Sequence, residues 1–152
     1  MSLIPVRSPG HLYIGDVRDS KNKTFFDEKE ISMVVNCTPN ITNSFTETCD
    51  YFRIPVNDDM HEDSYRLMFE TFPEVTEKIH GALQKGQNVL VHCQMGMQRS
   101  CAVVAAYLLR YYGGTYSETI AYIKKYRREA FFGDVNFWKP LQLYEFYLSK
   151  TE

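Results

Sequence analysis

Residues 89–100 of this chain of 152 residues read Val89-Leu90-Val91-His92-Cys93-Gln94-Met95-Gly96-Met97-Gln98-Arg99-Ser100, and they are the strongest indication of its fold. This stretch begins with an apolar run typical of a buried strand, and a second apolar run, of helical length, follows it. Cys93 is therefore predicted at the end of a strand and Arg99 at the start of a helix. A helix start offers free backbone N–H groups and the positive end of the helix dipole, so this turn is predicted to bind an anion.

The residue types in this turn suit a phosphate group and a nucleophile. Gly96 permits a tight turn of the backbone, and the guanidinium of Arg99 can bind two phosphate oxygens at once. Cys93 is predicted to be the nucleophile, because the pKa of a thiol, about 8.5 in model peptides, falls at helix N-termini and beside cations. Ser100 offers a hydroxyl that can stabilise the sulfur as it departs. The phosphate-binding residues are expected to be Gln94, Met95, Gly96, Met97, Gln98 and Arg99.

A simpler alternative is a core cysteine at a strand end, followed by a solvated arginine that opens a helix. A chance pair of Cys and Arg at this spacing would favour that interpretation, because short motifs often match without function. Here the preceding His92, the central Gly96, the following Ser100 and the change from strand to helix all agree with an anion site. We therefore favour the functional interpretation.

The motif His92-Cys93-x-x-Gly96-x-x-Arg99-Ser100 resembles the signature of the cysteine-dependent protein phosphatases. More narrowly, the chain is similar to a dual-specificity phosphatase catalytic domain. The similarity covers nearly all of the chain and includes residues 11–16, 34–40 and 54–58. It implies a protein phosphatase that hydrolyses phosphotyrosine, and phosphoserine or phosphothreonine as well, through a cysteinyl-phosphate intermediate. It implies no metal and no other cofactor.

The resemblance also implies a general acid on the acidic loop of residues 57–63. We assign Asp58 to this role, with Asp59 as the nearest rival, because an alignment across such a loop can slip by one residue. In the resulting scheme the Cys93 thiolate attacks phosphorus and Asp58 protonates the leaving oxygen. The ionised Asp58 then activates the water that releases phosphate. The catalytic residues are expected to be Cys93, Arg99, Asp58 and Ser100.

Two further residues are assigned supporting roles. His92 should point to the opposite side of the strand end from Cys93, so we expect a buried, hydrogen-bonded orienting group rather than an acid or base. The resemblance implies that this histidine helps to lower the pKa of the thiol. It also makes Cys37 a possible redox partner, because some related phosphatases protect the oxidised nucleophile in a disulfide. A packed core thiol is the alternative role for Cys37.

Hydrophobic patterns predict an α/β fold. Strands are expected at residues 12–14, 31–36, 51–55 and 89–92. The strand at 89–92 is apolar throughout, which is typical of a sheet covered on both faces. We therefore expect a single compact domain spanning residues 1–152. Its central, mostly parallel, twisted sheet should be flanked by helices, with a phosphatase-type P-loop at the carboxyl edge.

Helical patterns follow the acidic loop and the turn of residues 93–99, which we call the phosphate turn. Apolar residues from Met68 to Leu83 recur at spacings of three and four, and Pro73 should bend this helix or mark its start. Residues 101–109 should form a buried central helix. Thr115 and Glu118 match a capping box that starts the next helix. The last helix is expected from residue 139 or 140 to residue 148.

Composition restricts the partners and the compartment. With 17 Lys and Arg against 19 Asp and Glu, the net charge of −2 offers no basic field to attract nucleic acid. The four cysteines show neither a Cys-x-x-Cys pair nor metal-ligand spacing, which favours a reduced, cytoplasmic or nuclear setting. No apolar run suits a signal peptide or a membrane span, so neither secretion nor a membrane is expected. The partners should be phosphoprotein substrates, and we expect a monomer.

Other activities remain open at this point. A phosphate-binding interaction module would capture phosphoproteins without turnover. Phosphatases of the same superfamily act on RNA 5′-phosphates or on phosphoinositides. The neutral residues between Cys93 and Arg99 count against both of these substrates, because related phosphoinositide enzymes tend to carry cations in this loop.

The region after the central helices raises two more expectations. Lys124, Lys125, Arg127 and Arg128 form the strongest basic cluster. It either complements a helix C-terminus or recruits acidic and multiply phosphorylated substrates. In the segment of residues 129–141 the chain departs from the family pattern, and its aromatic residues are expected to lie mostly in the core.

Overall fold

Five strands form one sheet in the computed structural model, which describes residues 1–151. They are β1 (Ser2–Ile4), β2 (Leu12–Gly15), β3 (Ile31–Asn36), β4 (Asp50–Arg53) and β5 (Asn88–His92). Their order across the sheet is β1-β2-β5-β3-β4, and every pairing except β1 with β2 is parallel. The expected parallel sheet is confirmed, and β1 is an antiparallel edge strand that the sequence patterns did not predict.

Strand β5 lies in the middle of the sheet and ends directly before Cys93. It pairs with β2 on one side and β3 on the other. Its side chains alternate between the two faces, so Val89 and Val91 join one apolar cluster and Leu90 joins another. The turn that begins at Cys93 therefore follows a central strand that is buried on both faces.

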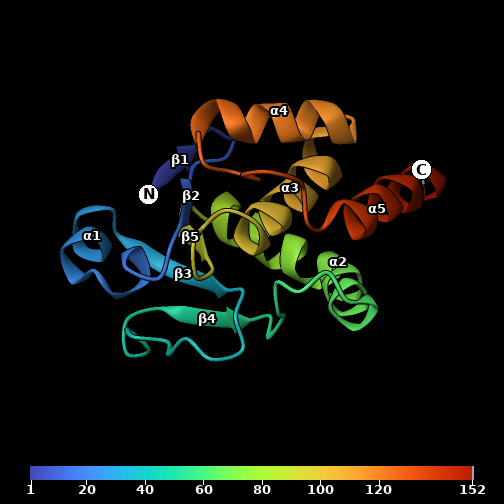
Figure 1. Cartoon of the computed structure of the whole chain (residues 1–152). Helices are drawn as coiled ribbons and strands as arrows, with labels where there is room; N and C mark the ends of the chain where they lie inside the picture. The colour runs from blue at the N-terminus through green and yellow to red at the C-terminus, as the bar shows by residue number, and fades with distance from the viewer. Residues whose placement is uncertain (152) are drawn as a thin grey trace.

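Helices cover the two faces unequally, as Figure 1 shows. Four helices pack on the face of Val89 and Val91: α2 (Glu62–Gln84), α3 (Arg99–Tyr112), α4 (Tyr116–Tyr126) and α5 (Trp138–Lys150). The other face is covered by α1 (Lys23–Glu28), which follows the short 3-10 helix η1 (Asp19–Lys21). The chain therefore has the expected single α/β domain, with its larger core between the sheet and α2 to α5.

Helix α2 begins earlier than its apolar pattern indicates and runs through Pro73. The alternative that Pro73 marks the helix start is therefore wrong. The ring of Pro73 is exposed, and its carbonyl accepts a hydrogen bond from Arg110 of α3 at 2.8 Å. The buried face from Met68 to Leu83 is confirmed.

The remaining helices start close to where the sequence predicts them. Residues 101–109 are buried within α3. The side chain of Thr115 accepts from the backbone of Glu118, and the reciprocal bond completes the capping box of α4. Helix α5 starts one residue before the expected range, with Pro140 in its first turn. Across residues 1–151 no helix combines the length and the apolar character that crossing a membrane requires.

Candidate active site

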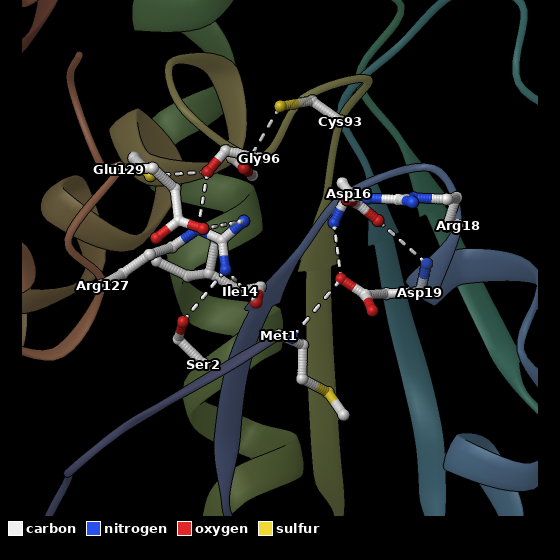
Figure 2. Close-up of polar contacts among 12 residues, drawn as sticks. Met1, Ser2, Ile14, Asp16, Arg18, Asp19, Cys93, Gly96, Arg127 and Glu129 are labelled. Carbon is white, nitrogen blue, oxygen red and sulfur yellow. Dashed lines mark hydrogen bonds and ion pairs between the residues drawn. The ribbon is translucent and has the colours of Figure 1, made fainter.

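Cys93 lies at the carboxyl end of β5 and is 2% exposed. Its sulfur lies 3.2 Å from the hydroxyl of Ser100 in the first turn of α3. Between these residues the backbone turns back on itself, and Cys93 and Gly96 lie on the same loop (Figure 2). The structure thus brings the predicted nucleophile and the predicted sulfur-stabilising hydroxyl into contact.

Only glycine fits at position 96. Its φ angle is +69°, a conformation that residues with a Cβ rarely adopt. A Cβ at this position would also lie 2.7 Å from the carbonyl oxygen of Gly15 and would collide with the side chain of Arg127. The backbone of the turn at Gly96 therefore lies so close to the end of β2 that no side chain fits between them.

The other residues of the turn divide into exposed and buried ones. Gln94 and Met95 are exposed, Met97 is partly exposed, and Gln98 is buried. Arg99 is the first residue of α3 and is partly buried. One of its terminal nitrogens, Nη1, donates to the carbonyl of Val56 at 3.0 Å. Its remaining donors are available to a phosphate, and the bond to Val56 ties Arg99 to the start of the acidic loop.

Arg127 lies beneath the turn and is 4% exposed (Figure 2). Its Nε donates to the carbonyl of Gly96 at 2.7 Å, and its Nη1 donates to the hydroxyl of Ser2 at 3.0 Å and to the carbonyl of Ile14 at 3.3 Å. Its nearest carboxylate in the structure is that of Glu129, at 3.8 Å and half exposed. The bond from Nε binds the Gly96 carbonyl, and the other two fix the guanidinium against β1 and β2.

This position corrects the expectation that Arg127 either complements a helix C-terminus or recruits substrates as part of a basic cluster. Helix α4 ends at Tyr126, and the chain then turns the next side chain inward beneath the sheet edge. Its neighbours Lys124, Lys125 and Arg128 are exposed, and the two lysines lie in the last turn of α4, where cations complement the helix dipole. Sequence patterns alone do not distinguish the inward arginine from the outward ones.

Gln98 connects the turn to the loop before α5. Its Nε2 donates to the carbonyls of Phe132 at 3.2 Å and Asp134 at 2.8 Å, and its Oε1 accepts from the backbone of Asn136 at 3.0 Å. The side chain of Asn136 in turn donates to Oδ1 of Asp58 at 2.9 Å. Sequence reasoning missed Asn136, because nothing in its local pattern marks a contact 78 residues away.

The two candidate acids have different surroundings. Asp59 accepts from the hydroxyl of Ser64 at 2.7 Å and from the backbone of His61 at 3.0 Å, at the start of α2. These hydrogen bonds lower the pKa of its carboxyl group. Asp58 is exposed, and within residues 1–151 its side chain accepts one hydrogen bond, from Asn136. Asp59 therefore stabilises the start of α2. Asp58 is held next to residues 132–136, the segment that Gln98 binds.

His92 is buried at the end of β5, and its Nδ1 lies 3.4 Å from the carbonyl of Cys93. Burial lowers the pKa of its imidazole to about 4, and the nearby cations Arg53 and Arg99 act in the same direction. The ring is therefore neutral at neutral pH. Any help that His92 gives to the thiol comes from orientation and not from a positive charge.

Two other buried thiols lie near Cys93. The backbone N–H of Cys37 donates to the carbonyl of His92 at 2.9 Å, one step beyond the paired residues Asn36 and His92. Cys101 contacts the carbonyl of Gly96 through its sulfur at 3.5 Å. Burial, followed by the neighbouring Cys93, raises the pKa of both thiols. Cys37 and Cys101 are therefore protonated at neutral pH.

Metal ligands do not gather at this site. Within residues 1–151, no three His, Cys, Asp or Glu side chains form a group that could hold a metal ion. The elements here that can bind a phosphate are the N-terminus of α3, the guanidinium of Arg99 and the backbone of the turn.

Comparisons with known proteins identify the family of this chain. The family model described as "Dual specificity phosphatase, catalytic domain" matches residues 12–147. Protein phosphatase Slingshot of Drosophila melanogaster is 31% identical over 140 residues, which is 92% of this chain and 13% of that protein. The chain therefore spans only a small part of that relative's length.

Two solved structures have the same fold. The crystal structure of human DUSP28 matches with a TM-score of 0.87 at 24% identity and covers 100% of both chains. The human tyrosine phosphatase-like serine/threonine/tyrosine-interacting protein matches with a TM-score of 0.82 at 29% identity and covers 97% of each chain. With a family model that matches most of its length, this chain belongs to the dual specificity phosphatase catalytic domain family.

The depressed pKa of His92 predicts acid sensitivity. The imidazole of His92 binds a proton less well in the folded state than in the unfolded state. The stability that its neutral form contributes is therefore fully present above about pH 6.5 and is lost as the pH falls through about 4. We expect up to about 3 kcal/mol of the free energy of unfolding to be lost in this window. Urea unfolding at a series of pH values should show a shallower acid dependence for His92→Gln. If the free energy of unfolding fell equally with pH in His92→Gln and in the unaltered protein, His92 would not be the source of the acid sensitivity.

The buried position of Arg127 predicts a loss of activity on every substrate. Arg127→Gln should lower kcat/KM by roughly ten- to a hundredfold, because a displaced Gly96 misplaces the whole phosphate turn. A small aryl phosphate and a phosphoprotein should be affected equally. The exposed neighbour provides the control, since Arg128→Gln should leave aryl phosphate hydrolysis unchanged. A loss confined to the phosphoprotein would instead favour substrate recruitment by Arg127.

Proposed function

We propose that this chain is a protein phosphatase catalytic unit that hydrolyses phosphotyrosine, and phosphoserine or phosphothreonine as well. One observation is the main support. The Cys93 sulfur lies 3.2 Å from the hydroxyl of Ser100, and the turn that begins at Cys93 ends at Arg99, the first residue of α3. A phosphate in this turn would meet the sulfur of Cys93, the guanidinium of Arg99 and the free amides of α3. The matching family model supports the same activity.

In the first step the Cys93 thiolate attacks phosphorus and forms the sulfur–phosphorus bond as the bond to the leaving oxygen breaks. Arg99 and the backbone amides stabilise the negative charge on the phosphoryl oxygens. Asp58 gives its proton to the leaving oxygen. The products of this step are the free alcohol or phenol, the cysteinyl-phosphate and an ionised Asp58.

In the second step the ionised Asp58 takes a proton from a water molecule, which attacks phosphorus. The sulfur–phosphorus bond breaks, and Ser100 stabilises the departing thiolate by donating its hydroxyl proton in a hydrogen bond. Inorganic phosphate is released, and Asp58 is protonated again. The contact between Ser100 and Cys93 supports this role for the serine.

Asp58 is proposed as the general acid in preference to Asp59. Two hydrogen bonds to Oδ1 of Asp59, from the hydroxyl of Ser64 and the backbone of His61, hold that carboxylate at the start of α2. Those bonds also favour its ionised form. Asp58 is free of such bonds to the start of α2 and is tied instead, through Asn136 and Gln98, to the residue before Arg99.

The alternative function is a phosphate-binding module without turnover. One structural neighbour carries the words "phosphatase-like" and "interacting protein" in its name. Against this alternative for the present chain, the nucleophile, the arginine and the acid expected for turnover are all present. Phosphoprotein substrates fit the uncharged side chains of the turn better than a multiply charged lipid headgroup or RNA end does.

Substitution of the nucleophile and the acid tests this function. Cys93→Ser should abolish phosphate release from an aryl phosphate and from phosphopeptides, because no other group forms the covalent intermediate. Asp58→Ala should lower kcat by roughly a hundredfold, whereas Asp59→Ala should have a much smaller effect on kcat. Phosphate release from a phosphotyrosine, phosphoserine and phosphothreonine peptide panel measures all three. Saturable phosphopeptide binding without release by the unaltered protein would support the binding module.

Cys37 is proposed as a partner that protects the oxidised nucleophile. Neighbouring strands lie about 4.8 Å apart, and a disulfide needs a Cα separation of roughly 4.4–6.8 Å. Cys37 and Cys93 follow in-register residues of β3 and β5 and share one side of the sheet. Peroxide would oxidise Cys93 to a sulfenic acid, and the Cys37 thiol would then form the disulfide with release of water.

Mild peroxide treatment tests this proposal. We expect a peptide linked through Cys37 and Cys93 in mass spectra, and full recovery of activity with dithiothreitol. Cys37→Ser should lose activity irreversibly under the same treatment, because the unprotected sulfur oxidises further. Cys49→Ser is the matched control, since Cys49 is a buried thiol in the other cluster. Equal recovery in Cys37→Ser and the unaltered protein would assign Cys37 to packing alone.

A further inference from the structure

Asn136 is held at three points in the loop before α5. Its backbone N–H donates to Oε1 of Gln98 at 3.0 Å, and its carbonyl accepts from the hydroxyl of Tyr65 at 2.9 Å. Its side-chain amide donates to Oδ1 of Asp58 at 2.9 Å. The first two bonds anchor the main chain of Asn136 to the phosphate turn and to α2. The third leaves the side chain to act on Asp58.

Gln98 gives this anchor its rigidity. It is 7% exposed, and both ends of its amide are bonded to the segment of residues 132–136. Gln98 directly precedes Arg99, whose guanidinium binds the carbonyl of Val56 two residues before Asp58. The acidic loop is thus tied to the phosphate turn from both sides.

We propose that Asn136 is a positioning residue for proton transfer by Asp58, an inference that rests on the function proposed above. An amide N–H that donates to Oδ1 occupies that oxygen as an acceptor, so the proton of the acid belongs on Oδ2. Asn136 therefore selects which oxygen of Asp58 faces the leaving group. Without it, the exposed carboxyl group rotates freely, and the protonated oxygen faces the substrate for only part of the time.

The same hydrogen bond serves both steps of the reaction. In the second step Asp58 must accept a proton from water as a carboxylate. A hydrogen bond from an amide to a carboxylate stabilises the ionised form. Asn136 thus keeps Asp58 aligned as an acid in the first step and supports it as a base in the second.

Substitution at position 136 can separate this role from folding. The bonds to Gln98 and Tyr65 use only the main chain of Asn136, so Asn136→Ala removes one donor and keeps the anchor. Asn136→Asp keeps the shape and replaces the donor with a charge that repels Asp58. Gln142→Ala is the matched control, because Gln142 is an exposed amide residue on α5.

The experiment compares two aryl phosphates in the full chain. Phenyl phosphate has a poor leaving group that needs a proton, whereas difluoromethylumbelliferyl phosphate has a good leaving group that needs almost none. We expect Asn136→Ala to lower kcat roughly tenfold on phenyl phosphate, with a much smaller change on the second substrate. Asn136→Asp should show at least the same selectivity. Inhibition by inorganic vanadate and alkylation of Cys93 by iodoacetate should not change, because the phosphate turn is intact.

The outcomes distinguish this inference from the function on which it rests. If Asp58→Ala shows the leaving-group selectivity and Asn136→Ala does not, the positioning role is overturned and the assignment of Asp58 stands. Equal losses on both substrates for Asn136→Ala, together with weaker vanadate inhibition, would also overturn it, since they indicate a damaged turn. If Asp58→Ala shows no selectivity, both the acid assignment and this inference fall.

Discussion

The phosphate turn depends on a hydrogen bond that points its central carbonyl outward. The Nε of Arg127 holds the oxygen of Gly96 at 2.7 Å from below, so the amides of the turn are free to point toward the site above. The left-handed backbone of Gly96 and its close approach to Gly15 make this arrangement possible. A buried guanidinium with a half-exposed carboxylate at 3.8 Å as its nearest counter-ion is costly. Its backbone and hydroxyl acceptors offset part of that cost, and a bound phosphate above it would offset more.

Charge at this site comes from arginines rather than from the histidine. Burial keeps His92 neutral above about pH 4, and burial also keeps the neighbouring Cys37 and Cys101 as thiols. Arg99 at the start of α3 donates to the carbonyl of Val56, and Arg127 beneath the turn donates to that of Gly96. Two arginines therefore lie at the phosphate turn of a chain whose net charge is −2. A local site of this kind attracts a phosphate group without attracting polyanions in general.

The parts of the fold that follow from local pattern were predictable from the sequence. The strand before Cys93, the buried helix after Ser100 and the capping box at Thr115 all depend on residues close together in the chain, and the structure has each of them. Strand β1 is too short to show a pattern, and it is held by pairing with β2. The start of α2 was missed because its first turns are polar, and the apolar stripe begins later. Arg127 and Asn136 were misread or missed because their partners, Gly96 and Asp58, lie 31 and 78 residues away.

Both of these distant contacts come from one segment between α4 and α5. Arg127 opens the segment and acts on the phosphate turn, whereas Asn136 near its end acts on the acidic loop. Gln98 crosses between them and binds the middle of the segment at Phe132 and Asp134. Because each contact uses a different side chain, substitutions here can alter phosphate binding and proton transfer separately. The segment between α4 and α5 thus joins the two halves of the site.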